Sequence, residues 1–209
     1  MKKLYKVFQL YYRLAFDEDS YFKHYGFLKS IKTDRPFDKD GNPLPWMNYA
    51  ILDFFAEKLN KDLTLFEYGL GFSTLYFSER VKSVKSIEHD KTWFNDIQSS
   101  LAGKPNVDIQ LVELDNGYEK AVNTMKDKYD IILVDGRKRV ECAKNSFDQL
   151  SDNGVLILDD SQREKYQGAF DFYAEKGFRK LTFTGIKPSG FRRYASTIFY
   201  RANNNCLDI

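Results

Sequence analysis

From residue 63 onward, short apolar runs alternate with segments whose apolar positions recur at helical spacing. Short apolar runs predict buried β-strands, and a repeat of about 3.6 residues predicts amphipathic helices. The predicted strands are Leu63–Glu67, Val84–Glu88, Val107–Val112, Tyr129–Asp135, Val155–Asp159, Lys180–Thr184 and Ser196–Arg201. The predicted helices are Thr74–Arg80, Thr92–Leu101, Gly117–Lys126, Arg139–Leu150 and Glu164–Lys176. This alternation predicts right-handed βαβ units and a mainly parallel sheet.

The last two predicted strands have no helical pattern between them. The segment that joins them carries Pro188 and Gly190, which predict a loop, so these strands should pair as an antiparallel hairpin. We therefore expect an α/β fold: a doubly wound, seven-stranded, mainly parallel sheet that ends in a C-terminal antiparallel hairpin.

Residues 1–60 show helices and loops in place of strands. The first helical pattern is carried by Leu4, Val7, Phe8, Tyr11 and Leu14. A stretch rich in turn residues follows over Asp34–Pro45, and Pro45 then precedes a second helical pattern that runs to Glu57. We expect residues 1–60 to form an N-terminal helical extension or cap and residues 61–209 to form a Rossmann-like domain.

The first predicted helix is basic, since no acid precedes Asp17. Its charged residues are Lys2, Lys3, Lys6 and Arg13. Such a helix can bind a membrane surface or a partner, but packing on the Rossmann core or over the active site is more ordinary, and we favour it. Polar residues interrupt the apolar run, no cleavage site follows, and no apolar stretch reaches the ~18 residues of a spanning helix. We expect a cytoplasmic protein with no transmembrane segment.

Charge and cysteine content exclude several classes of function. The net charge is only +2, so there is no broad electrostatic footprint for nucleic acid, which we consider an unlikely partner. Cys142 and Cys206 are far apart, and no Cys/His cluster exists, which argues against a structural zinc site or a disulfide framework. Both are expected to be free thiols, with Cys142 in the core. The oligomeric state stays open.

The most informative segment is the glycine loop that follows the first predicted strand, LFEYGLGFST over residues 65–74. Gly69 and Gly71 allow the backbone to pass close to a ligand, and Ser73 and Thr74 are natural caps for the next helix. A nicotinamide dinucleotide fingerprint requires a third glycine, where this chain has Thr74. The acidic Glu67 suits a cationic ligand better than a pyrophosphate.

Glu67-x-Gly69-x-Gly71 resembles motif I of the class I S-adenosylmethionine-dependent methyltransferases, with Ser73 at the family's usual third glycine. The wider run over residues 45–160 resembles a bacterial branch of that family whose substrates are poorly defined. The resemblance implies S-adenosylmethionine as the cofactor. It does not supply the acceptor.

The resemblance also implies roles for single residues. Glu88, at the end of the second strand, would accept hydrogen bonds from both ribose hydroxyls of the cofactor, with His89 at the rim of the adenine site. Asp115 would meet the adenine amino group, while Trp93 either flanks the adenine or belongs to the core. The full set of predicted cofactor residues is Glu67, Tyr68, Gly69, Gly71, Ser73, Thr74, Glu88, His89, Asp115 and Asp135.

Acidic residues end the fourth and fifth predicted strands, on the side where parallel sheets bind ligands. Asp135, Asp159 and Asp160 resemble the metal ligands of catechol-type O-methyltransferases, and Lys138 occupies the position of their lysine base. Three such oxygen ligands would suit Mg²⁺. The alternative is that Asp135 contacts the cofactor's amino group, while Asp159 and Asp160 cap the next helix.

Basic residues near the chemistry end predict an acceptor clamp for an acidic group. They are Arg137, Lys187, Arg192 and Arg193, the last three expected in the loop of the hairpin. A solvated, mobile hairpin is the alternative.

We therefore predict an S-adenosylmethionine-dependent methyltransferase that methylates a hydroxyl of a small molecule or glycan, with Asp135 and Lys138 as its catalytic residues. No Asn/Asp-Pro-Pro-aromatic motif follows the fourth strand, which argues against amine methylation of nucleic acid. Two alternatives stay open: a nicotinamide-dependent oxidoreductase and a non-catalytic Rossmann module that serves as an interaction surface.

Overall fold

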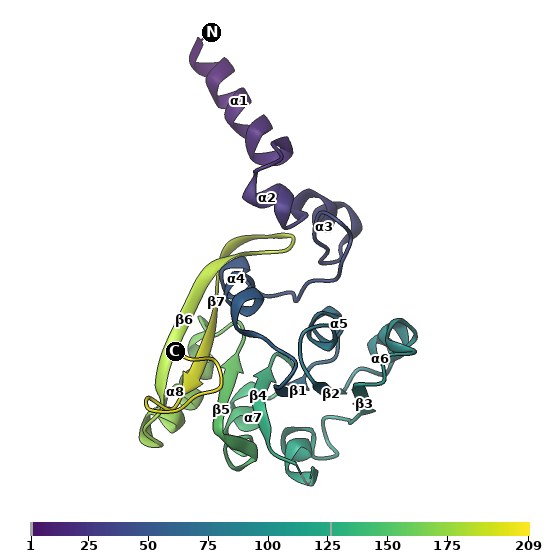
Figure 1. Cartoon of the computed structure of the whole chain (residues 1–209), viewed down its shortest axis with the longest axis vertical. Helices are drawn as coiled ribbons and strands as arrows, with labels where there is room; N and C mark the ends of the chain where they lie inside the picture. Colours follow the sequence, from purple (N-terminus) through teal and green to yellow (C-terminus); the bar gives the residue numbers. More distant parts are fainter. Residues whose placement is uncertain (1, 126) are drawn as a thin grey trace.

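The computed structural model describes residues 2–125 and 127–209, and its centre is a seven-stranded sheet in the order β3-β2-β1-β4-β5-β7-β6 (Figure 1). The strands are β1 Thr64–Tyr68, β2 Ser83–Glu88, β3 Val107–Leu111, β4 Tyr129–Val134, β5 Leu150–Leu158, β6 Arg179–Lys187 and β7 Gly190–Tyr200. Strands β1 to β5 pair in parallel, and β7 pairs antiparallel with both β5 and β6. The predicted fold class is confirmed.

Helices precede the sheet and connect its strands. The α-helices are α1 Lys2–Phe16, α2 Tyr21–His24, α3 Phe27–Thr33, α4 Tyr49–Lys58, α5 Phe72–Ser78, α6 Lys91–Gln98, α7 Arg139–Asn145 and α8 Gln167–Glu175. The 3₁₀ helices are η1 Ser99–Leu101, η2 Tyr118–Thr124, η3 Phe147–Gln149 and η4 Glu164–Tyr166. The helix predicted over Gly117–Lys126 is thus a 3₁₀ helix, and its last residue lies outside the described residues. Valine, asparagine and threonine at 122–124 are weak α-helix formers, which suits this tighter geometry.

Apolar layers cover both faces of the sheet. On one face, Phe55 of α4 and Phe77 of α5 pack with Ile131 and Leu133 of β4. On the other face, the alternate residues of the same strands pack with η2, α7 and α8. Since α4 belongs to the first of these cores, it forms a layer of the α/β fold. The division of the chain at residue 60 stays a prediction.

The C-terminal hairpin is longer than its sequence pattern suggested. Strands β6 and β7 pair up to Lys187 and Gly190, so only Pro188 and Ser189 lie between them. Arg192 and Arg193 are therefore strand residues, and their predicted place in a loop is wrong. The hairpin extends past the carboxyl ends of the parallel strands toward α3 (Figure 1).

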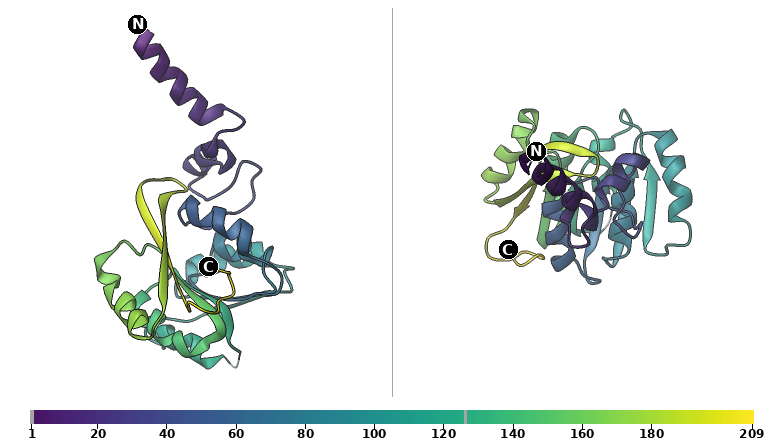
Figure 2. Two further views of the ribbon diagram at one scale, coloured as in Figure 1. Left: turned by 60° about the vertical axis from the view of Figure 1, so that its left-hand side comes forward. Right: turned by 90° about the horizontal axis from the view of Figure 1, so that it is seen from above.

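Helix α1 stands away from the sheet and points outward from the rest of the chain (Figure 1, Figure 2). Its apolar side chains are exposed, for example 77% for Leu4 and 67% for Phe8. The expectation that this helix packs on the core or covers the active site is wrong, because α1 lies beyond α2 and α3 and away from both faces of the sheet. Across residues 2–125 and 127–209, no helix has both the length and the apolar character required to cross a membrane.

Candidate functional site

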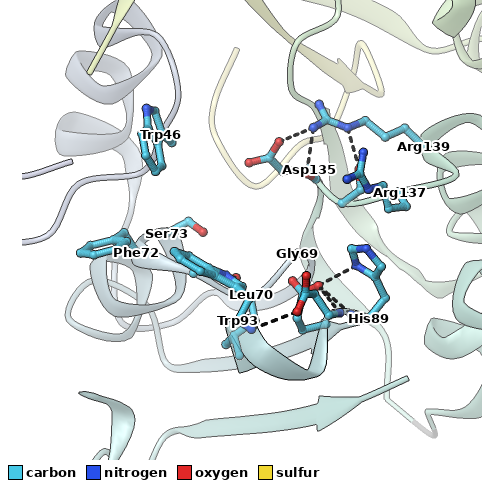
Figure 3. A pocket seen from close by; sticks show the side chains of 14 residues that line it. Trp46, Gly69, Leu70, Phe72, Ser73, His89, Trp93, Asp135, Arg137 and Arg139 are labelled. Atoms are coloured by element: carbon cyan, nitrogen blue, oxygen red, sulfur yellow. Dashed lines mark hydrogen bonds and ion pairs between the residues drawn. The ribbon is translucent and has the colours of Figure 1, made fainter. Parts of the chain in front are cut away.

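A pocket of about 390 Å³ lies at the carboxyl ends of β1, β2 and β4 (Figure 3). This is where a parallel sheet with crossover helices leaves a crevice for a ligand. The lining residues come from the glycine loop, the end of β2, the start of α6 and the β4–α7 turn, with Trp46 on the opposite wall. They are Trp46, Gly69, Leu70, Gly71, Phe72, Ser73, Glu88, His89, Asp90, Trp93, Asp135, Gly136, Arg137 and Arg139.

The two glycines of the loop have different structural roles. Gly69 has a φ of +107°, and a Cβ there would lie 3.1 Å from the backbone nitrogen of Gly136. Gly71 is extended, with a φ of −178°, and a Cβ there would meet nothing closer than the Trp93 ring at 3.8 Å. Gly69 is thus required by the turn itself, whereas Gly71 keeps the pocket wall free of a side chain.

This difference predicts effects of different size for the same substitution at the two positions. Gly69→Ala is expected to destabilise the fold by about 1–3 kcal/mol, the usual cost of a strained backbone position. Gly71→Ala is the matched control and should change the free energy of unfolding by less than about 0.5 kcal/mol, as for substitutions that create no clash. Urea denaturation of both variants measures the difference, and equal stabilities would contradict the assignment.

Glu88 ends β2 with its carboxylate in the pocket wall, and only 5% of the residue is exposed. Its Oε1 accepts hydrogen bonds from the backbone amides of His89 at 2.7 Å and Asp90 at 2.8 Å. The Nδ1 of His89 lies 2.6 Å from the same oxygen. Every contact that Glu88 makes with the described residues therefore engages Oε1, which leaves Oε2 for a ligand.

Two aromatic side chains shape the remaining walls of the pocket. The indole Nε1 of Trp93 donates to the carbonyl of Leu70 at 2.6 Å, which holds the ring beside the glycine loop. The indole Nε1 of Trp46 donates to the carbonyl of Pro188 at 2.8 Å and so joins the pocket wall to the hairpin turn. Trp93 thus lines the pocket and also packs against the apolar cluster that contains Leu70 and Ile97, and its role beside an adenine stays a prediction.

Asp135 follows β4 and faces the pocket beside Arg139 (Figure 3). The guanidinium of Arg139 contacts Asp135 Oδ1 at 2.7 Å and donates to the carbonyls of Asp135, Gly136 and Asp159. Burial raises the pKa of Asp135, and the guanidinium opposes that rise. Arg139 therefore fixes the orientation of this carboxylate.

Comparisons with known proteins identify the fold. No protein-family model and no curated protein matches the sequence, whereas solved structures do. A methyltransferase-like protein from Silicibacter pomeroyi is 24% identical, with a TM-score of 0.55 over 77% of this chain and 90% of that chain. Fibrillarin from Aeropyrum pernix, solved with S-adenosylmethionine, is 14% identical, with a TM-score of 0.55 over 72% of each chain. An rRNA methylase from Streptococcus thermophilus is 15% identical, with a TM-score of 0.53 over 71% and 93% of the two chains.

The chain has the class I methyltransferase fold. In that fold the pocket described above brings together six of the ten predicted cofactor residues, which are Gly69, Gly71, Ser73, Glu88, His89 and Asp135. Arg137 of the predicted acceptor clamp also lines the pocket.

Glu67 and Thr74 lie beneath the glycine loop of the methyltransferase fold and do not line its pocket. Glu67 is fully buried, and its Oε2 accepts hydrogen bonds from Thr74 at 2.5 Å and Ser86 at 2.6 Å, while Oε1 has no partner among the described residues. Burial raises the pKa of Glu67 to about 7, although hydroxyl groups around it oppose the rise. These two residues support the loop from below.

Three other predicted site residues also lie outside the pocket. Tyr68 is buried in the core and donates to the carbonyl of Glu119 at 3.2 Å. Asp115 is exposed. Lys138 has a φ of +46°, which turns its side chain away, and its Nζ donates to the carbonyl of Leu114 at 2.7 Å and to Glu119 at 3.0 Å. Two hydrogen bonds thus hold the Lys138 ammonium outside the pocket, which disfavours its predicted role as a base.

The residues do not fit the predicted Mg²⁺ site of the catechol-type methyltransferases. Asp135 is paired with Arg139, and Asp159 Oδ1 accepts a hydrogen bond from Ser196 at 2.6 Å. Asp160 is ion-paired with Arg163 and lies 3.3 Å from Lys187. Over the described ranges 2–125 and 127–209, no group of three or more acids, histidines or cysteines is arranged to hold a metal. Cationic and hydroxyl groups thus occupy the positions that a metal would need.

The residues of the predicted acceptor clamp do not lie together. Arg137 lines the pocket, whereas Lys187 is paired with Asp160 and its Nζ lies 4.3 Å from the centre of the Tyr194 ring. Arg192 and Arg193 are exposed on β7 and do not reach the pocket. The sequence missed Arg139 as a site residue. Its spacing of four residues from Asp135, at the start of a helix, is the signal that could have found it.

Proposed function

We propose that this protein is an S-adenosylmethionine-dependent methyltransferase whose cofactor binds in the pocket at the ends of β1, β2 and β4. The observation that carries the proposal is Glu88, a pocket residue whose Oε1 accepts hydrogen bonds from two backbone amides while Oε2 has no hydrogen-bond partner among the described residues. A carboxylate held in this way can accept hydrogen bonds from ribose hydroxyls. Gly71 leaves the adjacent wall open for a close backbone contact.

The shape and charge of the pocket support this cofactor over a nicotinamide dinucleotide. The Trp93 ring offers an aromatic surface for an adenine beside the glycine loop. Asp135, at the opposite end, carries the negative charge that suits a sulfonium. Thr74, which stands where a dinucleotide site has its third glycine, is buried under the loop and bonded to Glu67.

Asp135 is the proposed general base. S-adenosylmethionine, when bound, supplies an electrophilic methyl group. Arg139 holds Asp135 Oδ1, so that Oδ2 remains to orient an acceptor hydroxyl and take up its proton. A carboxylate whose pKa is raised by burial is a stronger base than an exposed one, and Asp135 is such a group.

The proposed acceptor is the hydroxyl group of a small molecule or glycan. Arg137 lies in the pocket wall, where its guanidinium can bind an acidic group of the acceptor. The rRNA methylase of the same fold makes a nucleic acid the main alternative. The net charge of +2 favours the smaller acceptor, because phosphate-rich partners are usually bound by strongly basic surfaces. The cytoplasmic location stays a prediction.

Calorimetric titration with S-adenosylmethionine, S-adenosylhomocysteine and NAD tests the cofactor assignment. We expect both sulfur compounds to bind and NAD not to bind. Glu88→Ala should weaken binding of both by about 1–3 kcal/mol, the scale for hydrogen bonds to a charged group. Glu113→Ala is a matched control, because Glu113 is exposed and lies outside the pocket. Binding of NAD alone, or equal affinities of the two variants, would overturn the proposal.

A further inference from the structure

Helix α1 presents an apolar surface that no other part of the described chain covers. An α-helix advances about 100° per residue, so positions along α1 can be assigned to faces. Leu4, Val7, Phe8 and Tyr11 fall on one broad face and line a shallow apolar groove with Tyr5. Their exposed fractions range from 42% for Val7 to 77% for Leu4. Large contiguous apolar surfaces of this kind mark interaction sites.

The opposite side of α1 is polar and basic. At about 100° per residue, Lys3, Lys6 and Arg13 fall with Gln9 within an arc of about 120°. No acid lies within the helix. Arg13 is paired with Asp17 just beyond the helix end, at 3.2 Å, and the Arg13 side chain is largely exposed. The two lysines make no ion pair with the described residues and therefore keep an unneutralised positive charge.

A second exposed surface of the same kind lies at the same end of the molecule. Phe191, at the start of β7, is 74% exposed, and its ring meets only the edge of Phe27 at 5.4 Å. Arg192 and Arg193 follow it, are exposed, and make no ion pair with residues 2–125 or 127–209. The hairpin and α1 both lie on the α2–α3 side of the molecule (Figure 1).

We propose that α1 lies in the plane of an anionic membrane surface, with its aromatic face toward the acyl chains and its lysines among the headgroups. A basic polar face opposite an apolar and aromatic face is the pattern of interfacial helices. Fifteen residues span only about 22 Å, less than the ~30 Å hydrocarbon core, so α1 lies on the bilayer and does not cross it. The inference does not depend on the proposed methyltransferase activity.

The charge of α1 favours an anionic membrane surface over a second copy of the chain as the partner of this helix. A second copy of α1 packed on the apolar face would leave the basic side in solvent without a counter-charge, since the helix has basic residues and no acid. The exposed apolar positions of α1, which also include Leu10, Tyr12, Leu14 and Phe16, span more than half of the circumference at about 100° per residue, whereas a two-helix seam needs only a narrow stripe. Anionic lipid neutralises the lysines and covers the whole apolar face at once.

Vesicle flotation of the full chain tests the proposal. We expect the protein to float with vesicles of phosphatidylcholine containing phosphatidylglycerol and to bind pure phosphatidylcholine at least tenfold more weakly. Neutralising Lys3, Lys6 and Arg13 to Gln should reduce binding to the anionic vesicles at least tenfold, because each basic residue near such a surface contributes about fivefold. The matched control is neutralisation of Lys82, Lys128 and Arg179, three exposed residues at the amino ends of the strands.

A tryptophan placed on each face of α1 tests the orientation of the helix. Phe8→Trp fluorescence should be quenched by brominated lipid, whereas Gln9→Trp on the polar face should not be quenched beyond the background of Trp46 and Trp93. Equal binding to neutral and anionic vesicles, or equal losses in the two triple variants, would overturn the proposal. The proposal would also be overturned if the wild-type chain did not bind vesicles and instead formed a stable oligomer that is lost in the α1 variants.

Discussion

Asp135→Asn is expected to lower the rate of methyl transfer by roughly 10²–10⁴-fold, the usual contribution of a general base. Asparagine keeps the shape of the side chain and can still accept a hydrogen bond from Arg139, but it cannot take up a proton. The affinity for S-adenosylmethionine should therefore change little. Transfer of a radiolabelled methyl group, to an acceptor found by screening hydroxyl compounds, measures the effect.

The control for this variant is Asp171→Asn, which removes one exposed carboxylate from α8. It should leave both the rate and the affinity unchanged. If Asp135→Asn abolishes cofactor binding together with turnover, Asp135 binds the cofactor and is not the base. If turnover is retained, another group removes the proton and the proposed chemistry is wrong.

The pH dependence of stability should report on Glu67, the buried acid beneath the glycine loop. Its pKa rises from the usual 4.5 to about 7 on folding, so the folded chain holds this proton more tightly than the unfolded chain does. The stabilisation is complete below about pH 4.5 and is lost as the pH rises toward 7. Glu67→Gln keeps a neutral group at every pH, so it should be more stable than the wild type at pH 8 by about 3 kcal/mol.

Urea denaturation of the ligand-free protein at pH 5 and pH 8 measures this change. The advantage of Glu67→Gln should be small at pH 5 and should appear at pH 8. Glu175→Gln, at an exposed position at the end of α8, should behave as the wild type at both values. An advantage of equal size at both pH values would mean that packing, and not the proton, determines the difference.

The centre of the sheet could be predicted from the sequence because β4 and the second half of β5 are nearly continuous apolar runs. Val155–Leu158 is fully buried between two helical layers, and burial of this kind leaves a clear pattern. The glycine loop was equally clear, since Gly69 occupies a backbone conformation that other residues adopt only with strain. Both signals are local, which explains why sequence alone was sufficient.

The β4–α7 turn is a part of the candidate site that could not be predicted correctly from the sequence. Lys138 and Arg139 are adjacent and both basic, and sequence spacing selected the first as a site residue. Lys138 has a left-handed backbone conformation, and the two neighbouring side chains have different partners: Arg139 pairs with Asp135, and Lys138 pairs with Glu119. Such a conformation is unusual for lysine and leaves no mark in the sequence.

For α1 the sequence left a membrane surface, a partner and the core open, and the packing on the core that we favoured is wrong for a different physical reason. An amphipathic pattern states that one side of a helix prefers an apolar environment, but it does not say whether protein or lipid provides it. Leu4 and Phe8 would give the same sequence pattern in a helix that packs on the sheet. Only the position of α1 beyond α2 and α3 distinguishes the two arrangements.

The hydrogen bond from Trp46 to Pro188 joins residues 142 positions apart in the chain. Asn48, two residues further on, donates to Ser196 Oγ at 2.8 Å across a separation of 148 residues. One wall of the pocket is thus anchored by the β6–β7 hairpin, which is synthesised after β1 to β5. Contacts of such long range form slowly, because most of the chain must be ordered before they stabilise anything. During synthesis, the pocket reaches its final shape only after the C-terminal hairpin has left the ribosome and inserted beside β5.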